Sequence, residues 1–293
     1  SGMLYFKKLV FMFACFTWNI LQAQQTNIPA TSFSHIYFVI DTAAYNALSQ
    51  NKFCTDTLFY YSKGAVNTDQ GSWDGQYFQG EADYWEVFQP DAVSKLSVGD
   101  IGLGFMLHQP YEAKIFQQQW QQLSSDSIQT HAFTMSAGKD TMMVEMMNYR
   151  DSMLTGGPSS FFALYYHPDI LRKIKFTEEN IQAGIDQKMI NQRSQANEQN
   201  KKLFNKVEKI YITLTPHEYS RHKIALLAMG YTETGNRHFK KDIEIDIQLE
   251  EKPTHRLNKI VFSLTRETGN RTITISPGLL LSITGEDGAL IIR

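Results

Sequence analysis

Aromatic and β-branched residues dominate a short stretch early in the chain. Residues 33–41, FSHIYFVID, are typical of a strand. Asp41 or Thr42 then caps a short predicted helix, TAAYNALSQN, and GSWDGQY reads as a glycine-rich turn. The following stretch, YFQGEADYWEVFQPD, predicts one or two strands that end at Pro90. The resulting order is a strand, a helix, then two or three strands.

The same order returns twice. Residues 100–108 are strand-like, and residues 111–123 place Ile115, Phe116, Trp120 and Leu123 on one side of a helix. HAFTMS, DTMMVEMMNY and SSFFALYYHPD then predict three strands. Later, KIYITLT is followed by a helix from Pro216 to Gly230, by the strictly alternating DIEIDIQLE, and by further strands. We therefore expect three copies of a βαβββ unit, since repeated units bury their faces against one another.

The pattern predicts an α+β protein of repeated βαβββ units with a connecting helix. Residues 31–169 are expected to form a pair of units, and residues 208–293 a third one. The intervening residues 170–207 are rich in Gln, Asn and Lys. Thr177 is suited to cap a helix there, and Ile181, Ile185 and Met189 follow at intervals of four residues, as on the apolar side of a helix.

The N-terminal residues predict a targeting segment. Lys7 and Lys8 precede an apolar run, and Ala23 follows it, which is the pattern of a secretory signal peptide over residues 1–23. The protein is then periplasmic or secreted, with no stable membrane span after signal removal. A membrane anchor is the alternative, although the run is short for a spanning helix. Lipid attachment through Cys15 is a third option.

Composition narrows the range of partners. The formal net charge is −2, so no overall positive field would attract nucleic acid. Only two cysteines are present, and Cys54 is alone if Cys15 leaves with the signal peptide, so the mature chain has no internal disulfide. Hydrophobic residues make up 42% of the chain and aromatic residues 13%, enough for a core and for apolar pockets. A small-molecule ligand is the expected partner.

The first predicted unit carries a recognisable motif. Its opening reads H-I-x-F-x-I-D and its closing strand Y-x-E-x-F-x-P. This combination resembles the vicinal oxygen chelate superfamily, which includes the glyoxalases and bleomycin-resistance proteins. Residues 33–169 also resemble a glyoxalase-like family of unknown function found in secreted bacterial proteins. The resemblance implies paired units whose sheets curl into a cup, with metal ligands on the first and last strands of each unit.

His35 and Glu86 occupy the two ligand positions of the first unit. Imidazole and carboxylate suit Zn²⁺, Ni²⁺, Fe²⁺ or Mn²⁺, but a catalytic site normally takes about three protein ligands. Gly102 and Leu164 stand at the corresponding positions of the second unit, and neither binds metal. Lys209 stands at the His35 position of the third. A register shift of one residue would instead bring in His108, Tyr166 or His167. The alternative to a metal site is a buried hydrogen-bonded pair of His35 and Glu86.

Aromatic residues suggest a pocket near this pair. The candidate ligand-binding residues are Tyr37, Trp73, Tyr84, Tyr166 and His167, with Trp85 and Tyr165 as further candidates. Such aromatics also pack simply as core. The sequence HEYSRH at 217–222 is one residue too long for the zinc-protease motif, and its histidines fall on different helix faces.

Three functions remain open from the sequence. In the first, a divalent metal at His35 and Glu86 supports lyase, isomerase or dioxygenase-type chemistry, with a carboxylate such as Glu86 or Glu145 moving a proton. In the second, the same fold without metal binds a small apolar or aromatic ligand. In the third, the unpaired third unit makes the protein a scaffold that forms a homodimer.

Overall fold

The computed structural model describes residues 28–68, 71–93, 96–137, 140–148, 157–198, 201–241 and 243–293. Strands and helices mix along the chain, so the predicted α+β class is confirmed. The predicted signal peptide, residues 1–23 with Cys15, lies outside these residues. The side chain of Glu145 also lies outside the description, so the structure does not bear on a role for it.

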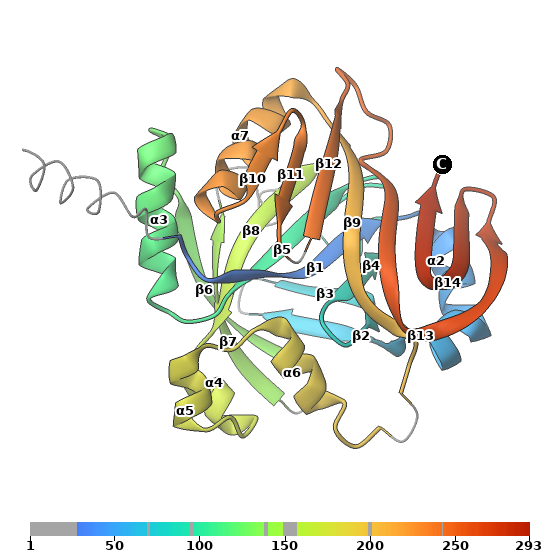
Figure 1. The fold of residues 1–293 in the computed structure, drawn as a ribbon, viewed down its shortest axis with the longest axis horizontal. Coiled ribbons are helices and arrows are strands. Elements are labelled where there is room, and N and C mark those ends of the chain that lie inside the picture. The colour runs from blue at the N-terminus through green and yellow to red at the C-terminus, as the bar shows by residue number, and fades with distance from the viewer. Residues whose placement is uncertain are drawn as a thin grey trace, which may run out of the picture.

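Eight strands close into a barrel (Figure 1). In order around it these are β1 (Thr31–Val39), β4 (Tyr84–Phe88), β3 (Gly71–Gln79), β2 (Tyr60–Thr68), β6 (Gln129–Ala137), β7 (Asp140–Asn148), β8 (Ser159–Tyr166) and β5 (Ile101–Leu107). β1 runs parallel to β4 and antiparallel to β5, and β5 runs parallel to β8. Closure leaves no free sheet edge, and alternate residues of each strand point inward.

The C-terminal part of the chain forms a separate sheet of six strands. Their order is β10 (Thr232–Thr234), β11 (Arg237–Lys240), β12 (Ile243–Leu249), β9 (Phe204–Leu214), β13 (Leu257–Ser276) and β14 (Leu279–Ile292). β9 is parallel to β12 and antiparallel to β13. The alternating sequence of β12 buries Ile243, Ile245 and Ile247 on one face and leaves polar residues on the other.

A helix directly follows each of the strands β1, β5 and β9. α2 (Thr42–Gln50) begins where the Asp41 side chain accepts a hydrogen bond from the Ala44 N–H, as predicted for this cap, and the π-helical turn η1 (Phe53–Leu58) comes next. α3 (Glu112–Leu123) buries Phe116 and Trp120. α7 (Pro216–Ala228) begins with a capping box in which Thr215 and Glu218 satisfy each other's backbone N–H groups.

The segment predicted as one connecting helix forms three short helices instead. These are α4 (Pro168–Lys173), α5 (Glu178–Ala183) and α6 (Gln187–Ser194), which lie together at one end of the barrel (Figure 1). Thr177 caps α5 as predicted. The helix cannot continue through Gly184, which has a φ of 102°, and Asp186 caps a new helix directly afterwards.

The main core lies between the outer face of the barrel and the C-terminal sheet. Trp85 of β4 is fully buried there, with ring centroids 4.7 Å from Phe59, 5.3 Å from Phe204 and 5.5 Å from Phe262. Each such side chain contributes roughly 1.5–3 kcal/mol by burial. Trp85 and Tyr165 both belong to this core. They are therefore packing residues and do not line the barrel interior, contrary to the aromatic-pocket prediction for these two.

Candidate functional site

The structure places His35 and Glu86 on the same, inward face of two neighbouring strands. In the parallel pair of β1 and β4, His35 lies opposite Tyr84, and Tyr37 lies opposite Glu86. The imidazole stacks on the Tyr84 ring with centroids 4.6 Å apart, and it also contacts Phe162 of β8. Alternation along a strand keeps Tyr84 and Glu86 on one side. Four of the predicted site residues therefore lie together on the inward face of the barrel: His35, Tyr37, Tyr84 and Glu86.

Glu86 is a buried carboxyl group with aromatic neighbours. Only 8% of it is exposed. The Trp73 indole Nε1–H donates a hydrogen bond of 3.3 Å to Oε1, and Tyr77 lies directly opposite on β3. Burial raises the pKa of Glu86 to about 7, although hydrogen bonds from Trp73 and Tyr77 act to lower it. The carboxyl group is therefore able to hold or give up a proton near neutral pH.

Tyr84 and Tyr166 complete the aromatic lining around this carboxyl group. Both are half-buried, so part of each side chain stays accessible. Burial, together with the charge of Glu86, raises the pKa of Tyr166 to about 12. Burial, then Tyr166 and Glu86, raise the pKa of Tyr84 as well. These hydroxyl groups stay protonated at neutral pH and can donate hydrogen bonds.

Two glycines of β5 make room for the inward rings. Gly104 lies opposite His35, and Gly102 lies opposite Tyr37. A β-carbon at either glycine would overlap the facing ring. Gly102 was expected to mark an absent metal ligand, and in the structure its role is steric. Neither glycine could become a larger residue without displacing a ring of the interior.

His167 and His108 lie away from His35 and Glu86. His167 is the N-cap of α4, where Nδ1 accepts a hydrogen bond from the Asp169 N–H, and its side chain is 38% exposed. The Nε2 atom of His108 lies 3.1 Å from the Ser32 hydroxyl. Among the described residues, no group of three or more His, Cys, Asp or Glu side chains could hold a metal ion.

Three polar residues beside His35 were missed by the sequence analysis. Ser34 lies 3.0 Å from His35 Nδ1 and donates a hydrogen bond of 2.8 Å to Gln187 of α6. Gln187 in turn donates to Asn191, at 2.8 Å. All of these side chains are buried. The available signal was weak: Gln187 and Asn191 are four apart and share one helix face, within a segment that contains many other Gln and Asn residues.

Comparison with known proteins covers nearly the whole described chain. Residues 33–290 match a family of unknown function, DUF5829. The chain belongs to this family. A search of curated proteins finds no match. The matched residues include both the barrel and almost all of the C-terminal sheet, so the family is defined by the two parts together.

A second polar cluster lies between the barrel and α7. Its cavity of about 340 Å³ is bordered by Ser159, Glu218, His222 and Arg256, among others. The Ser159 hydroxyl lies 2.8 Å from His222 Nε2 and donates to Glu218 Oε1 at 2.9 Å. Because its proton goes to Glu218, this hydroxyl accepts from His222 and is not activated as a nucleophile. The cluster is therefore better explained as a buried polar contact between two parts of the fold.

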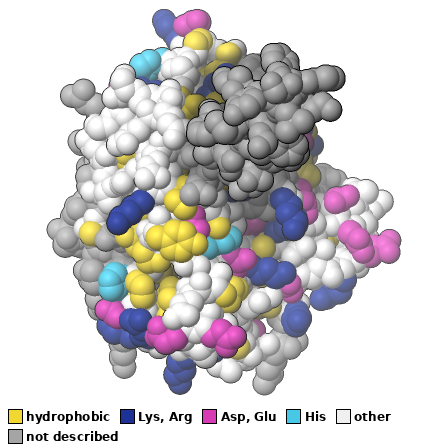
Figure 2. Space-filling model, turned by 60° about the vertical axis from the view of Figure 1, so that its left-hand side comes forward, with side chains coloured by type: hydrophobic (Ala, Val, Ile, Leu, Met, Phe, Trp, Pro, Cys, Tyr) yellow, Lys and Arg dark blue, Asp and Glu magenta, His cyan; other side chains and the backbone are white. Residues whose placement is uncertain are grey.

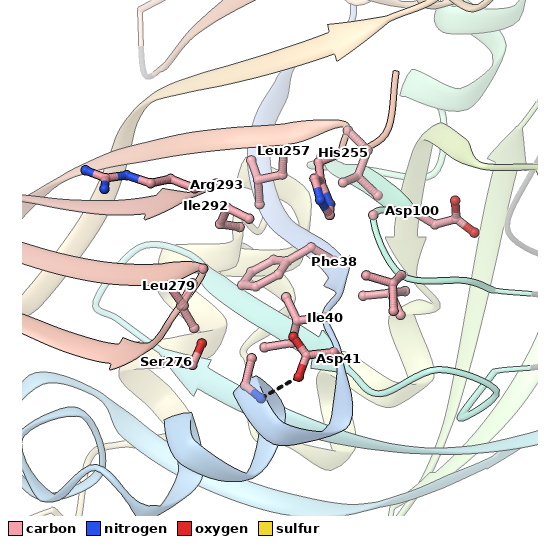
Figure 3. A pocket seen from close by; sticks show the side chains of 16 residues that line it. Phe38, Ile40, Asp41, Asp100, His255, Leu257, Ser276, Leu279, Ile292 and Arg293 are labelled. Carbon is pink, nitrogen blue, oxygen red and sulfur yellow. Dashed lines mark hydrogen bonds between the residues drawn. The ribbon is translucent and has the colours of Figure 1, made fainter. Parts of the chain in front are cut away.

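A smaller cavity of about 50 Å³ lies where the barrel meets the C-terminal sheet (Figure 3). Phe38 of β1 and Ile40, just after this strand, face Leu279 and Ile292 of β14 there. The Asp41 carboxylate is directed to the α2 N-terminus that it caps. The cavity is thus mainly apolar, and the Asp41 carboxylate beside it is already hydrogen-bonded as the cap of α2.

Hydrophobic side chains also reach the surface of the described part of the chain. Figure 2 shows hydrophobic side chains gathered in the middle of one face, with charged side chains around them. The exposed large hydrophobic residues of the described chain are spread along the sequence, with two of them at the ends of α3: Ile28, Val98, Tyr111, Leu123, Phe239 and Leu249. No helix within the described ranges is long and apolar enough to cross a membrane.

Proposed function

We propose that the protein binds a small molecule inside the barrel, against Glu86. The observation that carries this proposal is a buried carboxyl group held by Trp73 among the half-buried rings of Tyr84 and Tyr166. A small set of polar groups in an apolar, concave lining is the usual composition of a ligand site. The ligand class that fits is a compact molecule with an aromatic or apolar body and one or two polar groups.

We further propose that three segments of the chain are copies of one βαβββ unit, as the resemblance to the glyoxalase-like proteins implies. The support comes from matching registers. His35 and Tyr37 face Tyr84 and Glu86, while Lys209 and Tyr211 face Glu244 and Asp246. An Ile-Tyr pair thus takes the same place in both parallel strand pairs.

The third segment carries an ion pair where the first carries the candidate site. Lys209 Nζ lies 2.8 Å from Glu244 and 3.0 Å from Asp246. These charges are paired with one another on the outer, partly exposed face of an open sheet. The closed barrel, in contrast, keeps Glu86 away from solvent and from any cation among the described residues. Ligand binding is therefore assigned to the barrel and not to the C-terminal sheet.

Phenol is a suitable first probe because it combines one ring with one hydroxyl group. Isothermal titration of the protein with phenol should show saturable binding, and Trp73→Ala should weaken it at least about fivefold through loss of ring contact. Ser159→Ala, which alters the other polar cluster, is the matched control and should bind like the wild type. Equal weakening by both variants, or no binding, would contradict the proposal.

Metal-dependent chemistry at His35 and Glu86 stays a prediction. Two donors are fewer than a catalytic metal site uses, and the described residues do not complete the set. Metal analysis of the purified protein tests the prediction directly. A stoichiometric divalent ion that is lost in His35→Ala would establish the metal site, and equal metal content in both proteins would contradict it.

A further inference from the structure

A chain of buried hydrogen bonds runs from two backbone carbonyls to the imidazole of His35. The roles of donor and acceptor along this chain are fixed at Asn191, the end away from His35. The Asn191 Nδ2 group donates to the carbonyl oxygens of Gly80, at 3.1 Å, and Asp83, at 3.3 Å. Carbonyl oxygens only accept hydrogen bonds, so the amide nitrogen of Asn191 must face them. Its oxygen Oδ1 must therefore face Gln187.

The same argument assigns the donor and acceptor atoms of Gln187. Because Asn191 Oδ1 only accepts, Gln187 Nε2 donates to it, and Gln187 Oε1 is left to face Ser34. The Ser34 hydroxyl, which has a single proton, then donates its hydrogen bond to Gln187 Oε1, at 2.8 Å. The remaining lone pairs of the Ser34 oxygen can accept a hydrogen bond from His35 Nδ1, at 3.0 Å.

We infer that Ser34, Gln187 and Asn191 hold His35 as the neutral tautomer with its proton on Nδ1, which leaves the Nε2 lone pair for a ligand in the barrel. Within the described part of the chain, the ring of His35 makes its one side-chain hydrogen bond through Nδ1 and takes part in no ion pair. A ring packed between Tyr84 and Phe162 would be costly to charge. Ser34, Gln187 and Asn191 are positioning residues, since they act through His35.

This inference rests on the proposed function and narrows its ligand class. An unprotonated Nε2 accepts hydrogen bonds and gives none. The preferred ligand must therefore carry a donor, such as a hydroxyl or an N–H group, at the end that faces His35. An ether or ester of the same shape leaves Nε2 desolvated and unpaired, which costs binding.

The tautomer is measured by NMR of ¹⁵N-histidine-labelled protein, with the His35 signals identified by their absence in His35→Gln. The wild type should show a protonated Nδ1 and a bare Nε2 at neutral pH. Ser34→Ala and Gln187→Leu should shift His35 towards the other tautomer. Gln195→Leu is the matched control, because Gln195 donates to the same Gly80 carbonyl, at 3.0 Å, without touching the chain to His35. A wild-type His35 protonated on Nε2, or unchanged tautomers in both positioning variants, would overturn the inference.

The ligand class is measured with phenol and its methyl ether, anisole. Phenol should bind at least about fivefold more tightly than anisole, and Ser34→Ala should reduce that preference. Equal affinities would overturn the ligand class while binding itself is kept. Binding of neither probe would contradict the proposed function and the ligand class together, and the NMR result would then judge the tautomer alone.

Discussion

Gly104 of β5 lies opposite His35 of β1, and a β-carbon on this glycine would overlap the imidazole. The ring is held on its other sides by Tyr84 and Phe162, so it cannot move aside easily. Gly104→Ala should therefore destabilise the fold by about 1–3 kcal/mol, the usual range when an added methyl group overlaps a side chain that cannot move aside.

Gly64→Ala is the matched control for this substitution. Gly64 also lies in a barrel strand, but a β-carbon there would have no atom within 4 Å. Urea denaturation of the two variants compares them directly. A Gly64→Ala variant as unstable as Gly104→Ala would show that loss of glycine in a barrel strand, rather than contact with His35, causes the effect.

The buried carboxyl group of Glu86 should make stability fall as the pH rises. Burial raises its folded pKa to about 7 from the ordinary value of 4.5, so between these two pH values the protein loses stability, because the carboxyl group ionises in the unfolded chain while it stays protonated in the fold. Glu86→Gln removes this loss and should be more stable than the wild type above pH 7, by on the order of 3 kcal/mol. The two proteins should be nearly equal at pH 4.5.

Denaturant unfolding of both proteins across this pH range measures the difference. Glu179→Gln, an exposed change in α5, should reproduce the wild-type profile. A constant difference between Glu86→Gln and the wild type at every pH would mean that the pKa of Glu86 is the same in the folded and the unfolded protein, which would contradict the effect of burial.

His222 should produce the opposite dependence on pH. Burial, and then the charge of Arg256, lower its pKa to about 3 from 6.5. Its contribution to stability is present above pH 6.5 and is lost as the pH falls towards 3, at about 1.4 kcal/mol per pH unit for one proton. His35, whose pKa is likewise lowered to about 3 by burial, adds a parallel loss.

The variant His222→Gln should flatten part of this acid dependence. Glutamine keeps a donor for the Ser159 hydroxyl but has no ionisable group. His217→Gln, on the exposed side of the same helix, should keep the wild-type slope. The free energy of unfolding of all three proteins, measured at intervals from pH 7 to pH 4, tests this prediction. Identical dependence on pH in all three would show that His222 does not contribute to the loss of stability in acid.

The ion pair between Arg256 and Glu218 joins the start of β13 to α7 at the barrel surface. Arg256 Nε lies 2.8 Å from Glu218 Oε1, and both side chains are only 13% exposed. Arg256→Leu leaves a buried carboxylate without its cation and should cost about 3–5 kcal/mol. Lys52→Leu breaks the exposed pair with Asp56 and should leave the unfolding midpoint almost unchanged. Equal effects in thermal unfolding would contradict a buried role for Arg256.

Much of the local structure follows from the sequence. Alternation along a strand places His35 and Tyr37 of FSHIYFVID on one face, and Tyr84 and Glu86 of YWEVF on one face, whatever each strand pairs with. Asp41 and Thr177 were predictable caps because short polar side chains satisfy the first N–H groups of a helix. Such features depend on residues near one another in the chain.

Other features depend on contacts between distant residues and could not be predicted. The inward face of β1 and β4 lies inside a closed barrel only because β1 also pairs with β5 and β2 meets β6. Gln187 becomes a partner of Ser34 because α6 covers one end of that barrel, across 153 residues of sequence. Gly184 divides the expected connecting helix. A glycine can mark the end of a helix, but the spacing of the isoleucines favoured one continuous helix.

The Trp73 indole gives the most direct test of binding at Glu86. In ¹⁵N-labelled protein, its Nε1–H signal reports on the hydrogen bond to Glu86, while Trp85 in the core and Trp120, which donates to the Asp126 carbonyl, serve as internal references. Titration with phenol should shift the Trp73 signal saturably and leave those of Trp85 and Trp120 in place. A Trp73 signal that does not move, or three signals that move together, would contradict a ligand site inside the barrel.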